Sequence, residues 1–363
     1  MTTAHFHNLV VAEVRPETES AICLRFEVPD ALRETYRHEP GQHLILRKKL
    51  NGVELRPTYS IITPKGDPEL WIAIKRQEGG RFSNWANDEL KEGDVLEVMP
   101  PEGSFRTPLS PSNEKNYLAF AVGKGITPII SILRSVLEIE PNSRFTLVYA
   151  NTRVADIMFR EALFALKNRY PDRFELVLLL SQEEQDAEIL NGRLDGEKVK
   201  NLAQHVIQPG ASDEVFLCAP QAITDELLEV LPGFGLKPEQ IHFELFGAEE
   251  HRPINEPVEN STTHASESSQ LKQVTVVLDG IRTDIGVEAD GEAILDAALD
   301  AGLDAPFACK GGVCSTCRAR VLEGDVTMDV CYALEDDELE AGFVLTCQAH
   351  PVSDRVVVDY DEI

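Results

Sequence analysis

Four cysteines near the C-terminus have the spacing of an iron–sulfur ligand set. Four residues separate Cys309 from Cys314, and two separate Cys314 from Cys317. Cys347 follows after 29 further residues. A plant-type 2Fe–2S cluster takes three thiolates from such a loop and a fourth from a distant segment. The small residues Gly311 and Gly312 let backbone N–H groups approach the sulfurs. The predicted iron ligands are Cys309, Cys314, Cys317 and Cys347.

Two other kinds of cysteine site stay open. A structural zinc site usually has two tight cysteine pairs, whereas Cys347 stands alone. The segment Cys314-Ser315-Thr316-Cys317, taken alone, is similar to a redox-active dithiol, but it lacks a preceding strand and a following helix. The odd total of seven cysteines favours metal ligation in a reducing compartment over a disulfide framework.

A glycine-rich turn in the middle of the chain indicates nucleotide binding. An apolar strand ends at Val122, and the sequence continues Gly123-Lys124-Gly125-Ile126-Thr127-Pro128. We expect Thr127 to cap a helix and Pro128 to take its first position, so that the helix N-terminus faces a phosphate group. The turn does not have the form G-x-G-x-x-G.

A third motif, Arg56-Pro57-Thr58-Tyr59-Ser60, precedes this turn. Arginine offers a planar fork of donors for a diphosphate. Tyrosine offers a flat face for an aromatic ring, and serine adds a hydroxyl donor. In this order, the motif and the turn resemble the ferredoxin–NADP reductase superfamily, whose R-x-Y-S motif binds a flavin, and the segment Pro306 to Asp361 looks like a plant-type ferredoxin domain.

The resemblance implies particular roles for residues of this chain. Ser60 lies near flavin N5 and Cys218, in Cys218-Ala219-Pro220, near nicotinamide C4, and these two are the catalytic assignments. Ser83 caps a helix whose N-terminus holds the FAD pyrophosphate, and Phe246 covers a flavin face. The implied FAD residues are Arg56, Tyr59, Ser60, Ile74, Lys75, Gly80, Arg81, Phe82, Ser83 and Phe246. The implied pyridine-nucleotide residues are Gly123, Gly125, Ile126, Thr127, Pro128, Arg153, Cys218 and Pro220. Arg153 favours NADPH over NADH, because an arginine accommodates the 2′-phosphate.

The elements that must position these residues divide the chain into three domains. Residues 1–110 read as an antiparallel β-barrel, with a hairpin of Gln42–Lys49 and Val53–Ile62 around Asn51-Gly52, and the resemblance implies that this barrel binds FAD. Residues 111–246 alternate strand and helix and predict a parallel-sheet α/β domain for NAD(P)H. Its expected helices include Ile129–Ile139 and Ile157–Asn168. A flexible linker is expected at 247–270. The resemblance implies an α+β, β-grasp 2Fe–2S ferredoxin domain at 271–363.

Composition excludes some partners. Lys plus Arg is 34 and Asp plus Glu is 62, a net charge of −28. This charge argues against binding nucleic acid or an anionic membrane. No apolar run reaches about 18–20 residues, and the start lacks the layout of a signal peptide. We expect a cytoplasmic protein.

The domain order, flavin, then nicotinamide, then ferredoxin, resembles one class of oxygenase reductases. The resemblance implies that NADPH or NADH passes two electrons to FAD, and that the 2Fe–2S cluster hands them singly to the oxygenase component of a multicomponent monooxygenase or epoxidase. The cysteine loop and Phe243-Glu244-Leu245-Phe246 look most like the reductases of phenylacetyl-CoA epoxidases. Reductases of steroid or aromatic-ring oxygenases are the alternative. A redox-sensing regulator and a zinc-binding module on a flavoprotein also stay open.

Overall fold

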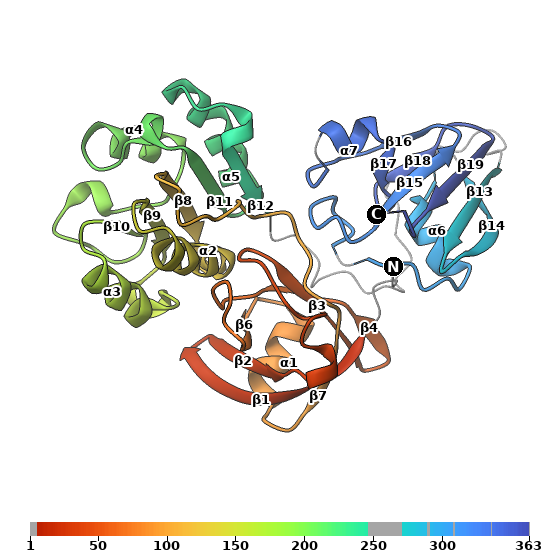
Figure 1. Cartoon of the computed structure of the whole chain (residues 1–363), viewed down its shortest axis with the longest axis horizontal. Helices are drawn as coiled ribbons and strands as arrows, with labels where there is room; N and C mark the ends of the chain where they lie inside the picture. Colours follow the sequence, from red (N-terminus) through yellow and green to blue (C-terminus); the bar gives the residue numbers. More distant parts are fainter. Residues whose placement is uncertain (1–5, 246–270, 289–290, 308, 335, 363) are drawn as a thin grey trace.

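Three large sheets follow one another along the chain, and a small two-stranded sheet accompanies the third (Figure 1). The computed structural model describes residues 6–245, 271–288, 291–307, 309–334 and 336–362. Phe246 and the linker expected at 247–270 therefore lie outside the described residues. No helix in the described ranges has both the length and the apolar character needed to cross a bilayer.

The N-terminal sheet is antiparallel and has seven strands. They are β1 (His7–Thr18), β2 (Ala21–Glu27), β3 (His43–Leu50), β4 (Val53–Leu55), β5 (Thr58–Ser60), β6 (Leu70–Lys75) and β7 (Val95–Val98). Their order is β4-β3-β7-β1-β2-β6, with β5 paired to β3. A bridge from Ile61 to Ile72 returns the chain to β6 and closes the barrel. Helix α1 (Arg81–Glu89) packs Phe82 and Ala86 into the barrel core.

The barrel differs from the sequence expectation at one strand. The predicted strand Val53–Ile62 is interrupted at Arg56-Pro57 and becomes β4 and β5. Proline has no N–H to donate to a ladder, so the pairing stops there and resumes at Thr58. Strand β5 then continues the pairing with β3 in the same register as β4, with His43 opposite Ser60.

The middle sheet is parallel throughout, with the order β10-β9-β8-β11-β12. Its elements are β8 (Asn116–Val122), α2 (Ile126–Ile139), β9 (Arg144–Asn151), α3 (Arg160–Arg169), β10 (Phe174–Leu180), α4 (Gly196–His205), β11 (Glu214–Cys218), α5 (Gln221–Val230) and β12 (Ile241–Glu244). Separate apolar cores lie on its two faces, as expected for a parallel sheet covered by helices. Helix α2 begins three residues earlier than predicted, and α3 begins at Arg160 rather than Ile157.

The third sheet belongs to the C-terminal domain and has the order β14-β13-β19-β15-β17. The elements are β13 (Leu271–Leu278), β14 (Ile281–Glu288), α6 (Ile294–Asp300), β15 (Arg318–Glu323), β16 (Val326–Met328), α7 (Asp336–Glu340), β17 (Phe343–Leu345), β18 (Ala349–Pro351) and β19 (Arg355–Asp359). Helix α6 packs its apolar face on this sheet. The expected β-grasp architecture is confirmed. Short 3-10 turns elsewhere are η1 (Asp30–Leu32), η2 (Gly123–Gly125), η3 (Val154–Asp156), η4 (Glu188–Leu190), η5 (Pro209–Ala211), η6 (Leu231–Phe234) and η7 (Pro238–Gln240).

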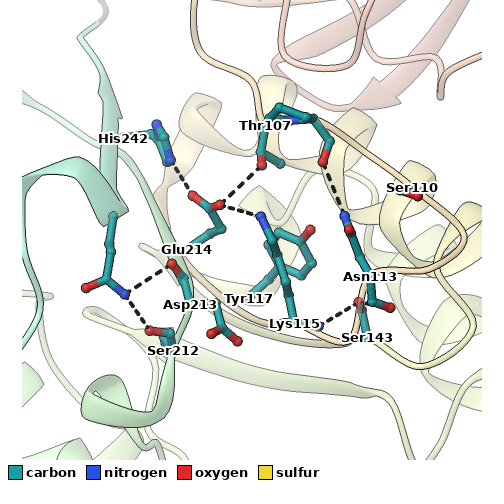
Figure 2. Close-up of polar contacts among 12 residues, drawn as sticks. Thr107, Ser110, Asn113, Lys115, Tyr117, Ser143, Ser212, Asp213, Glu214 and His242 are labelled. Atoms are coloured by element: carbon teal, nitrogen blue, oxygen red, sulfur yellow. Dashed lines mark hydrogen bonds and ion pairs between the residues drawn. The ribbon is translucent and has the colours of Figure 1, made fainter.

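A polar network ties the exit of the barrel to the middle sheet (Figure 2). The carboxylate of Glu214, at the start of β11, accepts hydrogen bonds from Thr107 Oγ1 at 3.4 Å and Lys115 Nζ at 2.6 Å. It also lies 2.6 Å from His242 Nε2. Burial opposes ionisation of Glu214, but the hydrogen bonds from His242 and Lys115 outweigh it and lower the pKa of this carboxyl. The network therefore joins the segment that leaves the barrel to the start of β11, at the sheet edge opposite the strand ends that carry the glycine turn.

Candidate functional site

One pocket is lined by all three domains. The barrel, the glycine turn with the end of β12, and the cysteine loop each supply part of its wall. The lining residues are His43, Pro57, Thr58, Tyr59, Ser60, Ala73, Lys75, Lys124, Thr127, Glu244, Leu245, Cys309, Val313 and Cys314. The sequence motifs at Ser60, Thr127 and Cys309 are thus brought to one place, although more than 240 residues separate the first from the last.

Strand β5 supplies the barrel side of the pocket. Ser60 and Thr58 alternate with Tyr59 along the strand, so their hydroxyls share a face. Ser60 is 1% exposed. Among the described atoms, Ser60 Oγ and Thr58 Oγ1 are buried and have no hydrogen-bond partner. Tyr59 is also buried, and its ring lies 5.8 Å from that of Phe82 on α1.

A buried histidine and glutamate face one another in this pocket. His43 Nδ1 lies 3.5 Å from Glu244 Oε1, with side chains 3% and 11% exposed. In the described part of the chain, neither ring nitrogen of His43 forms a hydrogen bond, and Glu244 Oε2 also has none. Sequence reasoning missed both residues. The available signal was a charged residue at an apolar strand end, in Phe243-Glu244-Leu245.

These unpaired polar atoms fit a bound flavin ring. Buried donors and acceptors without partners are costly, and native proteins rarely leave several together. A flat heteroaromatic ring with nitrogens and carbonyls on its edge would satisfy Ser60, Thr58 and His43 in one pocket. Lys75 adds a cation at the rim, although burial lowers the pKa of its ammonium group against the opposing effect of Asp156.

The other predicted FAD residues lie outside the pocket lining. Ile74 is fully buried in β6 and points into the barrel core. Helix α1 begins at Arg81 with Gly80 as its N-cap. The expectation that Ser83 caps this helix is therefore wrong; Ser83 lies in its first turn, and its Oγ accepts a hydrogen bond from the Gln77 N–H at 3.2 Å. The N–H groups of this first turn remain suited to phosphate oxygens.

The glycine turn brings the middle domain to the pocket. Turn η2 leads directly into α2, whose N-cap is Gly125. Thr127 is therefore not the cap, and its Oγ1 instead donates to the Lys124 carbonyl at 3.0 Å. Pro128 lies at the third helical position rather than the first, and like Ile126 it is buried and away from the pocket lining.

Cys218 lies at the end of β11, against this turn. A Cβ on Gly125 would lie 1.9 Å from the Cys218 carbonyl oxygen, so only glycine allows this approach. Burial, and to a lesser extent the Glu244 carboxylate, raise the pKa of the Cys218 thiol, which keeps it neutral. Pro220 is the N-cap of α5. Arg153 is exposed, outside the pocket lining, and its Nη2 lies 3.5 Å from Gln182 Oε1.

The four predicted iron ligands are all buried, between 2% and 8% exposed. The N–H groups of Gly311 and Val313 point at Cys309 Sγ, at 3.3 and 3.4 Å. Hydrogen bonds from Cys314 and Cys347, followed by these N–H groups, lower the pKa of the Cys309 thiol against the opposing effect of burial. Lys310 and Ser315 adopt positive φ angles of 48° and 53°, which lets the loop wrap inward.

This donor set fits a 2Fe–2S cluster. Buried sulfurs that receive backbone N–H groups are suited to hold negative charge away from water. No group of three or more His, Cys, Asp or Glu side chains is arranged around one metal ion in the described residues. A two-iron cluster needs only two protein thiolates on each iron.

The comparisons with known proteins agree with the three sheets. Residues 8–107 match the oxidoreductase FAD-binding domain model, residues 120–227 the oxidoreductase NAD-binding domain model, and residues 276–352 the 2Fe-2S iron-sulfur cluster binding domain model.

Similar proteins span the full chain. A component of the 1,2-phenylacetyl-CoA epoxidase of Escherichia coli (strain K12) is 44% identical over 361 residues, 99% of each chain. The ferredoxin reductase component of 3-ketosteroid-9-alpha-monooxygenase from Rhodococcus rhodochrous is 34% identical over 97% of this chain and 96% of that protein. Phthalate dioxygenase reductase has a similar fold, with a TM-score of 0.58, 22% identity and 98% of each chain covered.

Proposed function

This chain belongs to the family of reductase components that serve oxygenase systems, and from that membership we propose that its own partner is the oxygenase of a phenylacetyl-CoA epoxidase. The family carries electrons from NAD(P)H through FAD and a 2Fe–2S cluster. The full-length identity of 44% with a phenylacetyl-CoA epoxidase component supports this partner, against 34% for a ketosteroid monooxygenase reductase.

The chemistry divides between the cofactors and the chain. When bound, the flavin takes an electron pair from NAD(P)H and releases electrons singly, and the 2Fe–2S cluster takes them one at a time. The chain positions these groups and needs no side chain as a general acid or base. We assign Ser60, Thr58 and His43 to the polar edge of the flavin ring, with Tyr59 beside it. The proximity of His43 and Glu244 places the end of β12 against the barrel.

We infer that the glycine turn forms the part of the pocket that binds the nicotinamide. We assign Lys124 and Thr127, which line the pocket, to the pyridine nucleotide. We keep Cys218 near nicotinamide C4, where its thiol stays neutral because burial raises its pKa. Arg153 supports NADPH only through its position after β9, and NADH is the competing donor.

The iron assignment is Cys309, Cys314, Cys317 and Cys347. A cytoplasmic location goes with this proposal, because the reaction consumes NAD(P)H, and all seven cysteines are free of disulfides.

The experiment that tests the electron path is a visible spectrum of the purified protein, titrated anaerobically with NADPH and separately with NADH. We expect flavin and cluster absorbance to bleach in turn. A colourless C-terminal domain without iron would overturn the cluster assignment and favour zinc. Cofactor bleaching without NAD(P)H-dependent reduction of cytochrome c would favour a redox sensor.

A second experiment tests the partner. The reductase is mixed with the oxygenase of a phenylacetyl-CoA epoxidase, and NAD(P)H oxidation is followed with and without phenylacetyl-CoA. A 3-ketosteroid monooxygenase oxygenase with its steroid serves as the matched comparison. Faster turnover with the steroid system would overturn the partner and keep the electron path.

A further inference from the structure

Arg56, expected to bind a diphosphate, contacts the ferredoxin domain instead. Its Nη2 donates to Asp304 Oδ1 at 2.7 Å, and its Nε donates to Glu54 Oε1 at 2.8 Å. The guanidinium also lies over the Phe307 ring, 4.5 Å from its centroid. The Arg56 side chain is 7% exposed, so its guanidinium makes these contacts largely away from water.

The spacing of the motif explains why Arg56 contacts the ferredoxin domain and not the pocket. Arg56 precedes Tyr59 by three residues, whereas R-x-Y-S places the arginine two residues before the tyrosine, a position held here by Pro57. Pro57 and Thr58 line the pocket, but Arg56 does not.

Two of the partners of Arg56, Asp304 and Phe307, lie shortly before the cysteine loop. Asp304 is five residues before Cys309 and Phe307 two before it. Arg47 reinforces the contact, with Nη1 3.6 Å from Asp304 Oδ2. By contacting this short segment, Arg56 and Arg47 therefore fix the position of Cys309 relative to the barrel.

The loop held in this way covers the pocket. Cys309 and Cys314 pack with Ile45 and Met99 of the barrel in one apolar cluster, beside Val313. Two contacts of Tyr332 also join the domain to the middle domain: Gln221 Nε2 donates to Tyr332 OH at 3.3 Å, and the rings of Phe243 and Tyr332 lie 6.4 Å apart, edge to face. Figure 1 shows the C-terminal domain, drawn in blue, beside the barrel, with its loops facing the other two domains.

We propose that Arg56 is a positioning residue for electron transfer from the barrel pocket to the cluster: it grips Asp304 and Phe307 and so holds loop 309–314 over the pocket. This inference rests on the family's electron path. A carboxylate and an aromatic ring suit an arginine better than a lysine, because the planar guanidinium forms forked hydrogen bonds and stacks at the same time.

The test uses the full-length holoprotein. Asp304→Asn keeps the size of the side chain and removes its charge, and Asp300→Asn makes the same change at an exposed position of α6 in the same domain. FAD and iron contents are measured first. Stopped-flow absorbance after mixing with NADPH then separates flavin reduction from cluster bleaching, and small-angle X-ray scattering gives the radius of gyration.

We expect Asp304→Asn to keep both cofactors and the rate of flavin reduction. Its cluster bleaching slows by about three- to tenfold, in line with the loss of one partly desolvated ion pair, and its radius of gyration increases. Asp300→Asn matches the wild type. Arg56→Ala slows bleaching as well, Arg56→Lys is intermediate, and the double variant Arg56→Ala/Asp304→Asn is no slower than Arg56→Ala, because the two residues share one interaction.

Two results would overturn the proposal. One is an Asp304→Asn protein with wild-type cluster bleaching and wild-type radius of gyration. The other is an Arg56→Ala protein that loses FAD while Asp304→Asn has no effect, which would make Arg56 a diphosphate ligand. In either case, bleaching of the cluster by NADPH in the wild type keeps the electron path intact.

Discussion

Replacing Gly125 by alanine should impair use of the pyridine nucleotide and leave FAD in place. The backbone of Gly125 has φ −60° and ψ −9°, which alanine adopts without strain. The added Cβ, however, would lie 1.9 Å from the Cys218 carbonyl oxygen and 2.8 Å from its carbon. A Cβ essentially never approaches a heavy atom within 3.0 Å. The turn and Cys218 must therefore separate by about 1 Å.

Cys218 cannot retreat easily, because β11 is hydrogen-bonded to β8 on one side and β12 on the other. The start of α2 must move instead, and it carries Lys124 and Thr127 with it. Overpacking of this kind costs about 1–3 kcal/mol of unfolding free energy. A displacement near 1 Å at a reacting centre costs up to about 100-fold in rate. We expect kcat/KM for NADPH to fall by about 10- to 100-fold.

The matched control is Gly123→Ala in the same turn. Gly123 has φ +53°, and its Cβ would meet no heavy atom within 4 Å, so this variant tests backbone strain without a clash, at a cost of about 1–2 kcal/mol. Stopped-flow flavin reduction by NADPH is the assay, with dithionite reduction and FAD content as checks. A Gly125→Ala protein with wild-type NADPH saturation, or a Gly123→Ala protein that is the more impaired of the two, would refute the steric argument.

Three further outcomes follow from other contacts. Cys347→Ser should remove the 2Fe–2S absorbance and cytochrome c reduction while FAD content stays at one per chain, and an unchanged iron content would contradict the ligand assignment. Glu140→Ala should lower the unfolding free energy in urea by about 3 kcal/mol or more, because this fully buried carboxylate accepts hydrogen bonds from Tyr117 OH at 3.0 Å and Asn113 Nδ2 at 2.6 Å; a loss near zero would contradict it. Burial lowers the pKa of His38 below its ordinary 6.5, so the unfolded state binds the proton first and stability should fall as the pH drops below 6.5. His38→Gln should flatten that slope in thermal unfolding between pH 7 and pH 5, and an unchanged slope would assign the effect to other groups.

The sequence alone determined the class of each domain. Proline, glycine and apolar spacing act over a few residues, so the parallel sheet and the cysteine loop were readable from local patterns, whereas the β-grasp unit came from the resemblance to a ferredoxin domain. Local rules also failed where two signals competed. Thr127 and Ser83 are good capping residues by type, but glycine in each case preceded them as the N-cap, and the helices began earlier.

Only the tertiary structure decided which side chains, distant in the sequence, lie against one another. His43 and Glu244 are 201 positions apart and look like ordinary strand residues in the sequence, yet folding buries them 3.5 Å from each other. The contact of the Arg56 side chain with Asp304 depends on a strand interrupted at Pro57 and on a domain almost 250 residues further along the chain. Residue types report which chemistry is available, whereas burial and long-range contacts, which no local pattern encodes, decide which side chains meet and which hydrogen bonds remain for a ligand.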